Sequence, residues 1–184
     1  MAKKTLVIGA GNPLFGDDAL GYCVARLLEE CVEGRAFDVL ALQALEPGVV
    51  AYFEGYETVI FVDAVDPASL PEGAKMAVYE LDPKRLDNEE LVSVLSELSS
   101  HESNPLNLAV LGYAAGTLSR NARIALVGLR PYRIELGAGG LSSEACRLAL
   151  DAAGRVAGLA GGGVLNEECA RQLLESECGC REPL

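Results

Sequence analysis

TLVIGAGNPLFGDDALG, at residues 5–21, is the stretch of this 184-residue chain that decides its fold. Its first six residues form an apolar run that ends in a small-residue turn, which predicts a buried strand over Thr5–Ala10. Apolar residues at helical spacing then predict a helix over 16–31. A strand that passes through a glycine-containing turn into a helix is the repeating unit of α/β domains.

The same alternation of strand and helix signals continues along the chain. Apolar segments rich in β-branched residues predict further strands at Phe37–Leu42, 58–65, 75–81 and Arg123–Leu129, with a short edge segment at 132–136. Capping residues and apolar spacing predict helices at 47–54, 87–98, 104–118 and 142–159. This order predicts a three-layer α/β/α sandwich with a twisted, mostly parallel five-stranded sheet.

Residues 1–160 are predicted to form a single domain, and 161–184 a flexible, dispensable tail that begins with three glycines. Three of the six cysteines lie in apolar helical patterns and are expected to act as small buried hydrophobes. The other three are in the tail, and their role stays open between none and binding of a soft metal: Cys169, Cys178 and Cys180. No disulfide framework is expected, because the start of the chain makes a poor signal peptide.

The amino-acid composition indicates which classes of partner the protein can bind and where in the cell it is located. The chain has 15 Lys and Arg against 27 Asp and Glu, a formal net charge of −12. Such a surface is a poor match for nucleic acid, which requires clustered positive charge. The longest apolar runs are far too short to span a bilayer. We therefore expect a cytoplasmic protein that binds neither nucleic acid nor membrane.

Acidic residues occur where two of the predicted strands end, and the only histidine lies in a loop. Asp17 and Asp18 stand at the start of the first helix, Asp63 closes the strand at 58–65, and His101 lies between two predicted helices. Ligands of such sheets bind beyond the carboxyl ends of the strands. Asp18, Asp63 and His101 would together make an incomplete coordination shell for a divalent transition metal such as nickel or zinc. The alternatives are that the acid pair complements a helix dipole and that His101 is an ordinary surface residue.

The sequence lacks the residues that three other kinds of functional site would need. A dinucleotide loop would need glycine at the position of Leu14, and two carboxylates occupy the place where pyrophosphate would bind. The sequence has no His-Glu-x-x-His motif, so a zincin site is excluded. It has a single histidine and no Gly-x-Ser-x-Gly motif, which argues against a serine hydrolase.

Several motifs, in this order, resemble those of the nickel-iron hydrogenase maturation endopeptidases. GAGNPL at 9–14 with DD at 17–18 and Gly21 is similar to the first motif of that family, and FVDAV at 61–65 to the second. SH at 100–101 is similar to the third, and the C-terminal pattern has counterparts in GLRP at 128–131, IELG at 134–137 and LS at 141–142. The likeness covers roughly residues 4–160.

The resemblance implies an aspartyl-type endopeptidase that removes the C-terminal extension of a hydrogenase large-subunit precursor after nickel insertion. It implies that Asp18, Asp63 and His101 sense nickel carried by the substrate, with Asp18 and Asp63 as the catalytic carboxylates. We expect a monomer. Two departures are the turn LQAL at 42–45, which leaves the choice of hydrogenase open, and Ala19 in place of a usual glycine. The alternatives are a non-catalytic nickel-handling or assembly scaffold and, less favoured, a nucleotide-binding α/β module.

Overall fold

The chain folds around one mixed sheet of five strands in the order β3-β1-β4-β6-β5. The structure is a computed structural model that describes residues 4–82, 104–119 and 121–181. The strands are β1 (Thr5–Ala10), β3 (Phe37–Leu42), β4 (Thr58–Ala64), β5 (Met76–Leu81) and β6 (Arg123–Leu129). The first three and β6 are parallel, and β5 pairs antiparallel with β6 at one edge. The predicted mostly parallel five-stranded sheet is confirmed.

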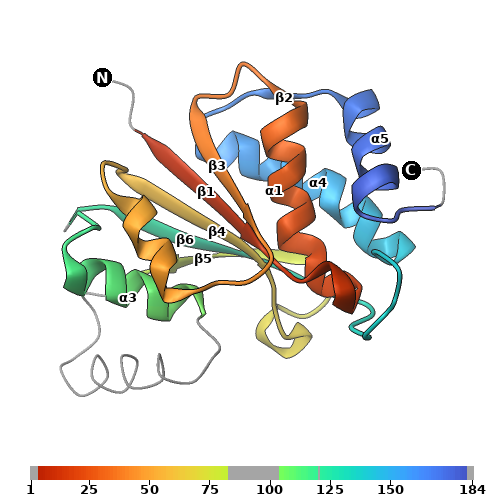
Figure 1. The fold of residues 1–184 in the computed structure, drawn as a ribbon, viewed down its shortest axis with the longest axis horizontal. Helices are drawn as coiled ribbons and strands as arrows, with labels where there is room; N and C mark the ends of the chain where they lie inside the picture. The colour runs from red at the N-terminus through yellow and green to blue at the C-terminus, as the bar shows by residue number, and fades with distance from the viewer. Residues whose placement is uncertain (1–3, 83–103, 120, 182–184) are drawn as a thin grey trace.

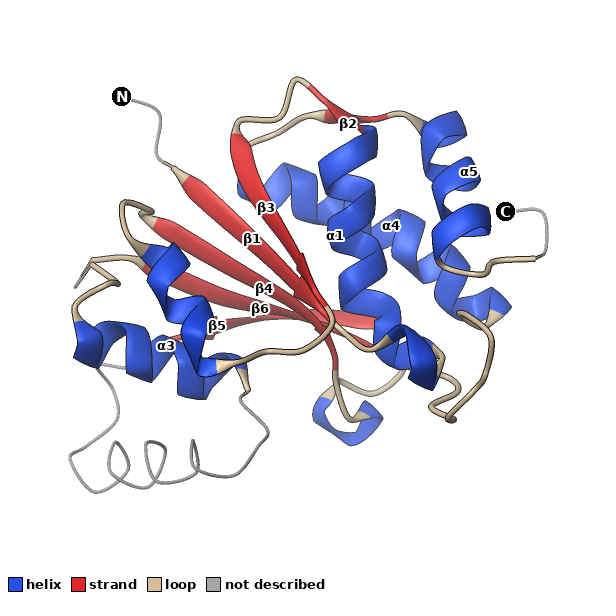
Figure 2. Cartoon of the chain, in the orientation of Figure 1, coloured by secondary structure: helices blue, strands red, loops and turns tan. Residues whose placement is uncertain are grey.

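Helices cover both faces of the sheet, as Figures 1 and 2 show. On one face lie α1 (Leu20–Cys31) and α4 (Ser143–Ala160), with α5 (Glu167–Glu177) beside α1; on the other lie α3 (Pro105–Ala115) and the 3-10 helix η3 (Pro47–Phe53). Alternate residues of β1 serve the two layers: Val7 packs with α1 and α4, whereas Leu6 and Ile8 pack with η3 and α3. No helix in the described ranges is long and apolar enough to cross a membrane.

Side-chain caps fix the starts of the helices. The Ser142 hydroxyl accepts from the Ala145 N–H at the start of α4, and the Asn104 side chain accepts from the Asn107 N–H at the start of α3, as the sequence predicts. The segment predicted as a helix at 47–54 is a 3-10 helix, η3. Shorter helical elements are η1 (Pro13–Phe15), η2 (Asp17–Ala19) and η4 (Pro67–Ser69). The predicted helix at 87–98 lies outside the described residues.

The segment after the triple glycine does not match the expected flexible tail. Strand β7 (Val164–Leu165) pairs antiparallel with β2 (Val32–Glu33), and α5 packs against α1. The expectation of unpaired cysteines is wrong, because three disulfides join this segment to α1 and α4: Cys23–Cys178, Cys31–Cys169 and Cys146–Cys180. Helix α5 buries only a short apolar stripe, so its sequence gave a weak helical signal. The disulfides join cysteines that are too distant in sequence for local patterns to reveal their pairing.

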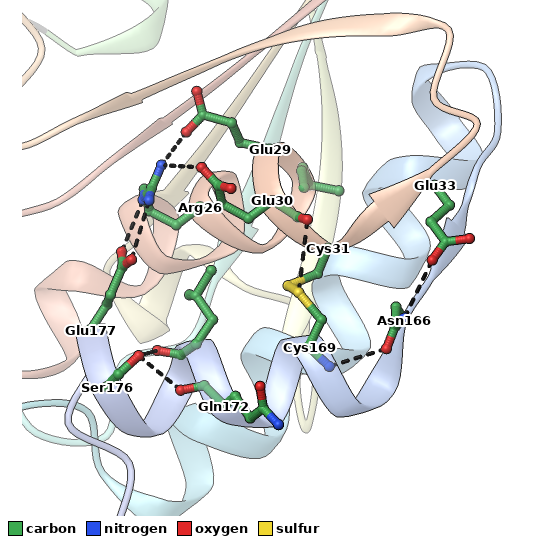
Figure 3. Close-up of a disulfide and its surroundings, with 12 residues drawn as sticks. Arg26, Glu29, Glu30, Cys31, Glu33, Asn166, Cys169, Gln172, Ser176 and Glu177 are labelled. Carbon is green, nitrogen blue, oxygen red and sulfur yellow. Dashed lines mark hydrogen bonds and ion pairs between the residues drawn. A yellow bond between two sulfur atoms is a disulfide. The ribbon is translucent and has the colours of Figure 1, made fainter.

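Figure 3 shows how α5 is fastened to α1 around the Cys31–Cys169 disulfide. At the other end of α5, the Arg26 guanidinium donates to the Glu177 carboxylate, with Nε 2.9 Å from Oε2. That hydrogen bond and the positive charge of Arg26 hold the pKa of the Glu177 carboxyl below its usual value. Ion pairs this exposed contribute little to stability. The disulfides and the buried side chains of α5 therefore provide most of the attachment.

Candidate active site

The loop that follows β1 positions Asp18 near the carboxyl end of the sheet. The Asn12 side chain accepts from the Leu14 N–H at 3.0 Å and so caps the turn η1. The Asn12 backbone N–H donates to Asp18 Oδ2 at 2.9 Å. Asp18 lies in the next turn, η2, directly before α1. Its carboxylate is therefore held in a fixed place above the end of β1.

Glycines let the first turn of α1 lie directly on the strand ends. A Cβ atom at Gly21 would be 2.1 Å from the carbonyl oxygen of Val62 and 2.3 Å from that of Ala10, closer than any side-chain carbon can approach. A Cβ atom at Gly11, where φ is +150°, would be 1.9 Å from the carbonyl oxygen of Asp18. These glycines therefore serve close packing of backbone against backbone, and this packing accounts for the glycine-rich loop without a bound nucleotide.

Asp63 comes from the neighbouring strand β4, one residue before its end. Burial, and then the negative charge of Asp18, raises the pKa of the Asp63 carboxyl from 3.8 to about 7, and a backbone hydrogen bond from Ala64 lowers it in part. Because the charge of Asp18 acts on Asp63, the structure brings these two predicted site residues together at the carboxyl edge of the sheet. The third, His101, lies outside the described residues.

Two neighbouring carboxylates, one of them buried and with a raised pKa, favour the approach of a cation. A divalent metal bound by both carboxylates would displace the proton from Asp63 and relieve their mutual repulsion. In the described ranges no group of three or more His, Cys, Asp and Glu side chains could hold a metal ion. Asp18 and Asp63 alone would leave most coordination positions open. The assignment of Asp18, Asp63 and His101 as one ligand set stays a prediction.

Asp63→Asn is expected to stabilise the metal-free protein at high pH and not at low pH. The folded-state pKa of about 7 lies above the value of 3.8 for a free carboxyl, so the folded protein holds an additional proton between these values. The free energy of unfolding therefore falls as pH rises from 4 to 7. At pH 8 the free energy of unfolding of the variant should exceed that of the wild-type protein by on the order of 4 kcal/mol at most. Urea unfolding at pH 4 and pH 8 measures this free energy of unfolding. An equal change at both pH values, or the same pH-dependent change in the exposed control Asp151→Asn, would contradict the assigned burial of Asp63.

Asp17 has a role that the sequence did not indicate. It is fully buried, and its carboxylate accepts hydrogen bonds from Tyr132, Arg133 and Ser142. None of these partners belongs to the helix that Asp17 precedes, so the helix-dipole interpretation does not describe its contacts. The partners lie more than a hundred residues away along the chain, and no local signal in the sequence points to them.

Exposed apolar side chains lie beside the loop that leads from β1 to Asp17 and Asp18. The predicted edge segment at 132–136 pairs with the loop after β1 through a bridge between Gly16 and Ile134, and the Gly137 N–H donates to the Leu14 carbonyl at 2.8 Å. We call the side chains of Leu14, Ile134 and Leu136 the apolar strip. They are 63%, 57% and 69% exposed. Exposed apolar groups that gather in one place are typical of surfaces that bind other proteins.

Asn12 also lines a hollow of about 650 Å³. Leu42, Gln43 and Ala44 line it, together with Tyr52 from η3. These residues include the turn that departs from the family pattern.

Comparison with known proteins agrees with the predicted family at the level of the fold. No family model matches the sequence, and no curated protein matches it. The structure is similar to the nickel-iron hydrogenase maturation protease HycI from Thermococcus kodakarensis, with 25% identity over 85% of this chain and 92% of that chain and a TM-score of 0.57. It is also similar to a hydrogenase 2 maturation peptidase from a Thaumarchaeota archaeon, with 26% identity over 86% and 99% and a TM-score of 0.59.

A third solved structure shares only the fold. The hydrogenase maturating endopeptidase HybD from E. coli is 20% identical over 90% of this chain and 99% of that chain, with a TM-score of 0.58. Taken together, the chain has the fold of the hydrogenase maturation proteases across most of its length.

Proposed function

We propose that this protein is an endopeptidase that removes the C-terminal extension of a nickel-iron hydrogenase large-subunit precursor after nickel insertion. The observation that carries the proposal is the nearness of Asp18, in the turn η2 that follows β1, to Asp63, near the carboxyl end of β4. The pair occurs in a fold similar to that of a nickel-iron hydrogenase maturation protease and a hydrogenase 2 maturation peptidase. His101 supplies the third ligand, and the three residues recognise nickel held by the precursor.

The donor set supports recognition of a metal that belongs to the substrate. Two carboxylate oxygens and one imidazole nitrogen suit nickel, yet they leave coordination positions open. Thiolates of the precursor would fill those positions, since thiolates are good ligands for late transition metals. A protease built this way binds the precursor tightly only when nickel is present. Nickel is therefore part of the substrate and not a resident cofactor of this chain.

Two routes are open for hydrolysis of the peptide bond. In one, Asp18 or Asp63 takes a proton from the attacking water as a general base. In the other, nickel polarises the scissile carbonyl and the carboxylates hold the metal in position. Both routes need the two carboxylates near the scissile bond, and their nearness to each other supports this.

The exposed apolar strip supports a protein substrate. We expect Leu136→Ser to raise the KM for the precursor roughly tenfold, because burial of a leucine side chain in an interface stabilises it by about 1.5–3 kcal/mol. The kcat and the melting temperature should change little, since the side chain is 69% exposed in the free protein. Leu159→Ser is the matched control, because Leu159 is 49% exposed on α4. A KM that rises equally in both variants, or in neither, would contradict a role for the strip.

We also propose a monomer that acts in the cytoplasm, where disulfides are unusual. Disulfides persist mainly in oxidising compartments, and the cytoplasm of hyperthermophiles is the main exception. The Cα atoms of the three pairs are 5.5 to 6.2 Å apart, which is the ordinary range for disulfides. A cytoplasmic location therefore requires bonds that resist reduction there. Trapping of thiols with an alkylating agent in intact cells would test it.

The experiment that tests the proposed activity is incubation of the purified protein with a nickel-loaded precursor, followed by mass spectrometry. The expected product is a large subunit shortened at its C-terminus, together with the released peptide. Stable binding of the precursor without shortening would support the non-catalytic scaffold instead.

A further inference from the structure

The buried carboxylate of Asp17 joins two distant parts of the chain. Its Oδ1 accepts from the Ser142 N–H at 2.7 Å. Its Oδ2 accepts from the N–H groups of Tyr132 and Arg133, both at 2.8 Å, and from the Ser142 hydroxyl at 2.7 Å. The side chain is 0% exposed. Burial of a carboxylate is costly unless its oxygens are hydrogen-bonded, and here both oxygens are.

The main chain of Asp17 is fastened to the same segment. Its N–H donates to the Arg133 carbonyl at 2.9 Å, and the neighbouring Gly16 forms a bridge with Ile134. Ser142 is in turn the N-cap of the 18-residue helix α4. The turn η2 is therefore tied to a long helix that spans one face of the sheet.

The next residue in this turn is Asp18. Adjacent Cα atoms are only about 3.8 Å apart, so a shift of Asp17 must move Asp18. On its other side, Asp18 Oδ2 accepts from the Asn12 N–H at 2.9 Å. The Asp18 carboxylate thus depends on two supports, the loop after β1 and the buried Asp17.

We propose that Asp17 is a positioning residue for cleavage of the precursor, one that holds the Asp18 carboxylate toward Asp63. This inference rests on the proposed function. It assigns Asp17 a task distinct from that of Asp18. Asp17 is fully buried, so its side chain is not accessible to a substrate. Its two oxygens instead gather the segment at 132–133 and the start of α4 beneath η2.

Asp17→Asn tests the proposal with little change of volume. The amide would present an NH₂ group either to the Ser142 N–H or to the N–H groups of Tyr132 and Arg133. In both orientations at least one backbone N–H would face another donor and lose its partner. The segment must then shift, and Asp18 with it.

Two readouts separate positioning from general stability. In nuclear magnetic resonance, hydrogen exchange of the Asn12 amide should become at least tenfold faster, because this amide reports on the bond to Asp18. In cleavage of the nickel-loaded precursor, kcat should fall roughly 10- to 100-fold with KM changed less than about threefold, as for other residues that orient ligands. Val156→Ala is the control, because it opens a buried cavity at the far end of α4 and should leave both readouts unchanged.

Unchanged Asn12 exchange and unchanged kcat in a folded Asp17→Asn protein would overturn the proposal. Should that variant fail to fold, Ser142→Gly removes one of the four donors and keeps a residue that serves well as an N-cap. It should give the same changes at smaller size, and no change would again overturn the proposal. A wild-type protein that cuts no precursor would refute the proposed function, whereas the Asn12 amide would still report whether Asp17 holds Asp18.

Discussion

Reduction of the three disulfides is expected to lower the melting temperature of this protein by roughly 10 to 50 °C. The bonds join residues separated by 155, 138 and 34 positions along the chain. Each such bond typically contributes about 2–4 kcal/mol, and each kcal/mol moves the melting temperature of a domain this size by roughly 2–4 °C. Without them, α5 is attached mainly by three buried side chains: Ala170, Leu173 and Leu174.

Thermal unfolding followed by circular dichroism, with and without a phosphine reductant, measures this effect. Alkylation and intact mass should confirm that all six cysteines are free in the reduced sample. The double variant Cys31→Ser with Cys169→Ser isolates one bond and should show roughly a third of the effect. A fully reduced protein that melts within about 5 °C of the oxidised one would show that α5 does not depend on the disulfides.

Loss of any predicted nickel ligand is expected to abolish processing of the precursor. Asp18→Asn and Asp63→Asn keep the shape of the side chain, but a neutral amide is a much poorer metal donor than a carboxylate. His101→Ala removes the nitrogen donor. Changes to residues that only orient ligands already cost 10- to 100-fold, so loss of a ligand should cost at least about 100-fold in kcat/KM.

Stability distinguishes loss of a ligand from loss of the fold. The sequence predicts that His101 lies in a loop, where a side chain has few packing contacts, so we expect His101→Ala to change the free energy of unfolding by no more than about 0.5 kcal/mol. Asp151→Asn, an exposed carboxylate on α4, is the control and should leave cleavage intact. Preserved cleavage in the His101 variant would remove this residue from the site. Lost cleavage together with a large fall in melting temperature would assign it to the fold instead.

The strands of the sheet could be predicted closely because buried parallel strands are continuous apolar runs. Thr5–Ala10 and Phe37–Leu42 begin and end as the sequence indicated. The meeting of Asp18 with Asp63 followed from a general rule, that the carboxyl ends of parallel strands share one edge of the sheet. Both predictions rest on signals that are local in sequence or on the topology they imply.

The remaining features depend on contacts that local patterns do not encode. Asp17 accepts from residues 115 to 125 positions away, so its role required the folded structure. The disulfides join cysteines 155, 138 and 34 positions apart, and the argument from the cellular compartment alone predicted free thiols. One local signal for α5 was present: Asn166 caps it, and Glu167 and Glu168 occupy its first turn.

The most direct test of nickel sensing compares two forms of one precursor. The purified protein is incubated with nickel-loaded and with nickel-free large-subunit precursor at equal concentration, and mass spectrometry follows loss of the C-terminal extension. We expect the nickel-loaded form to be shortened and the nickel-free form to remain intact, because Asp18, Asp63 and His101 leave coordination positions that only a metal-bearing substrate fills. Equal cleavage of both forms would contradict nickel recognition by this site.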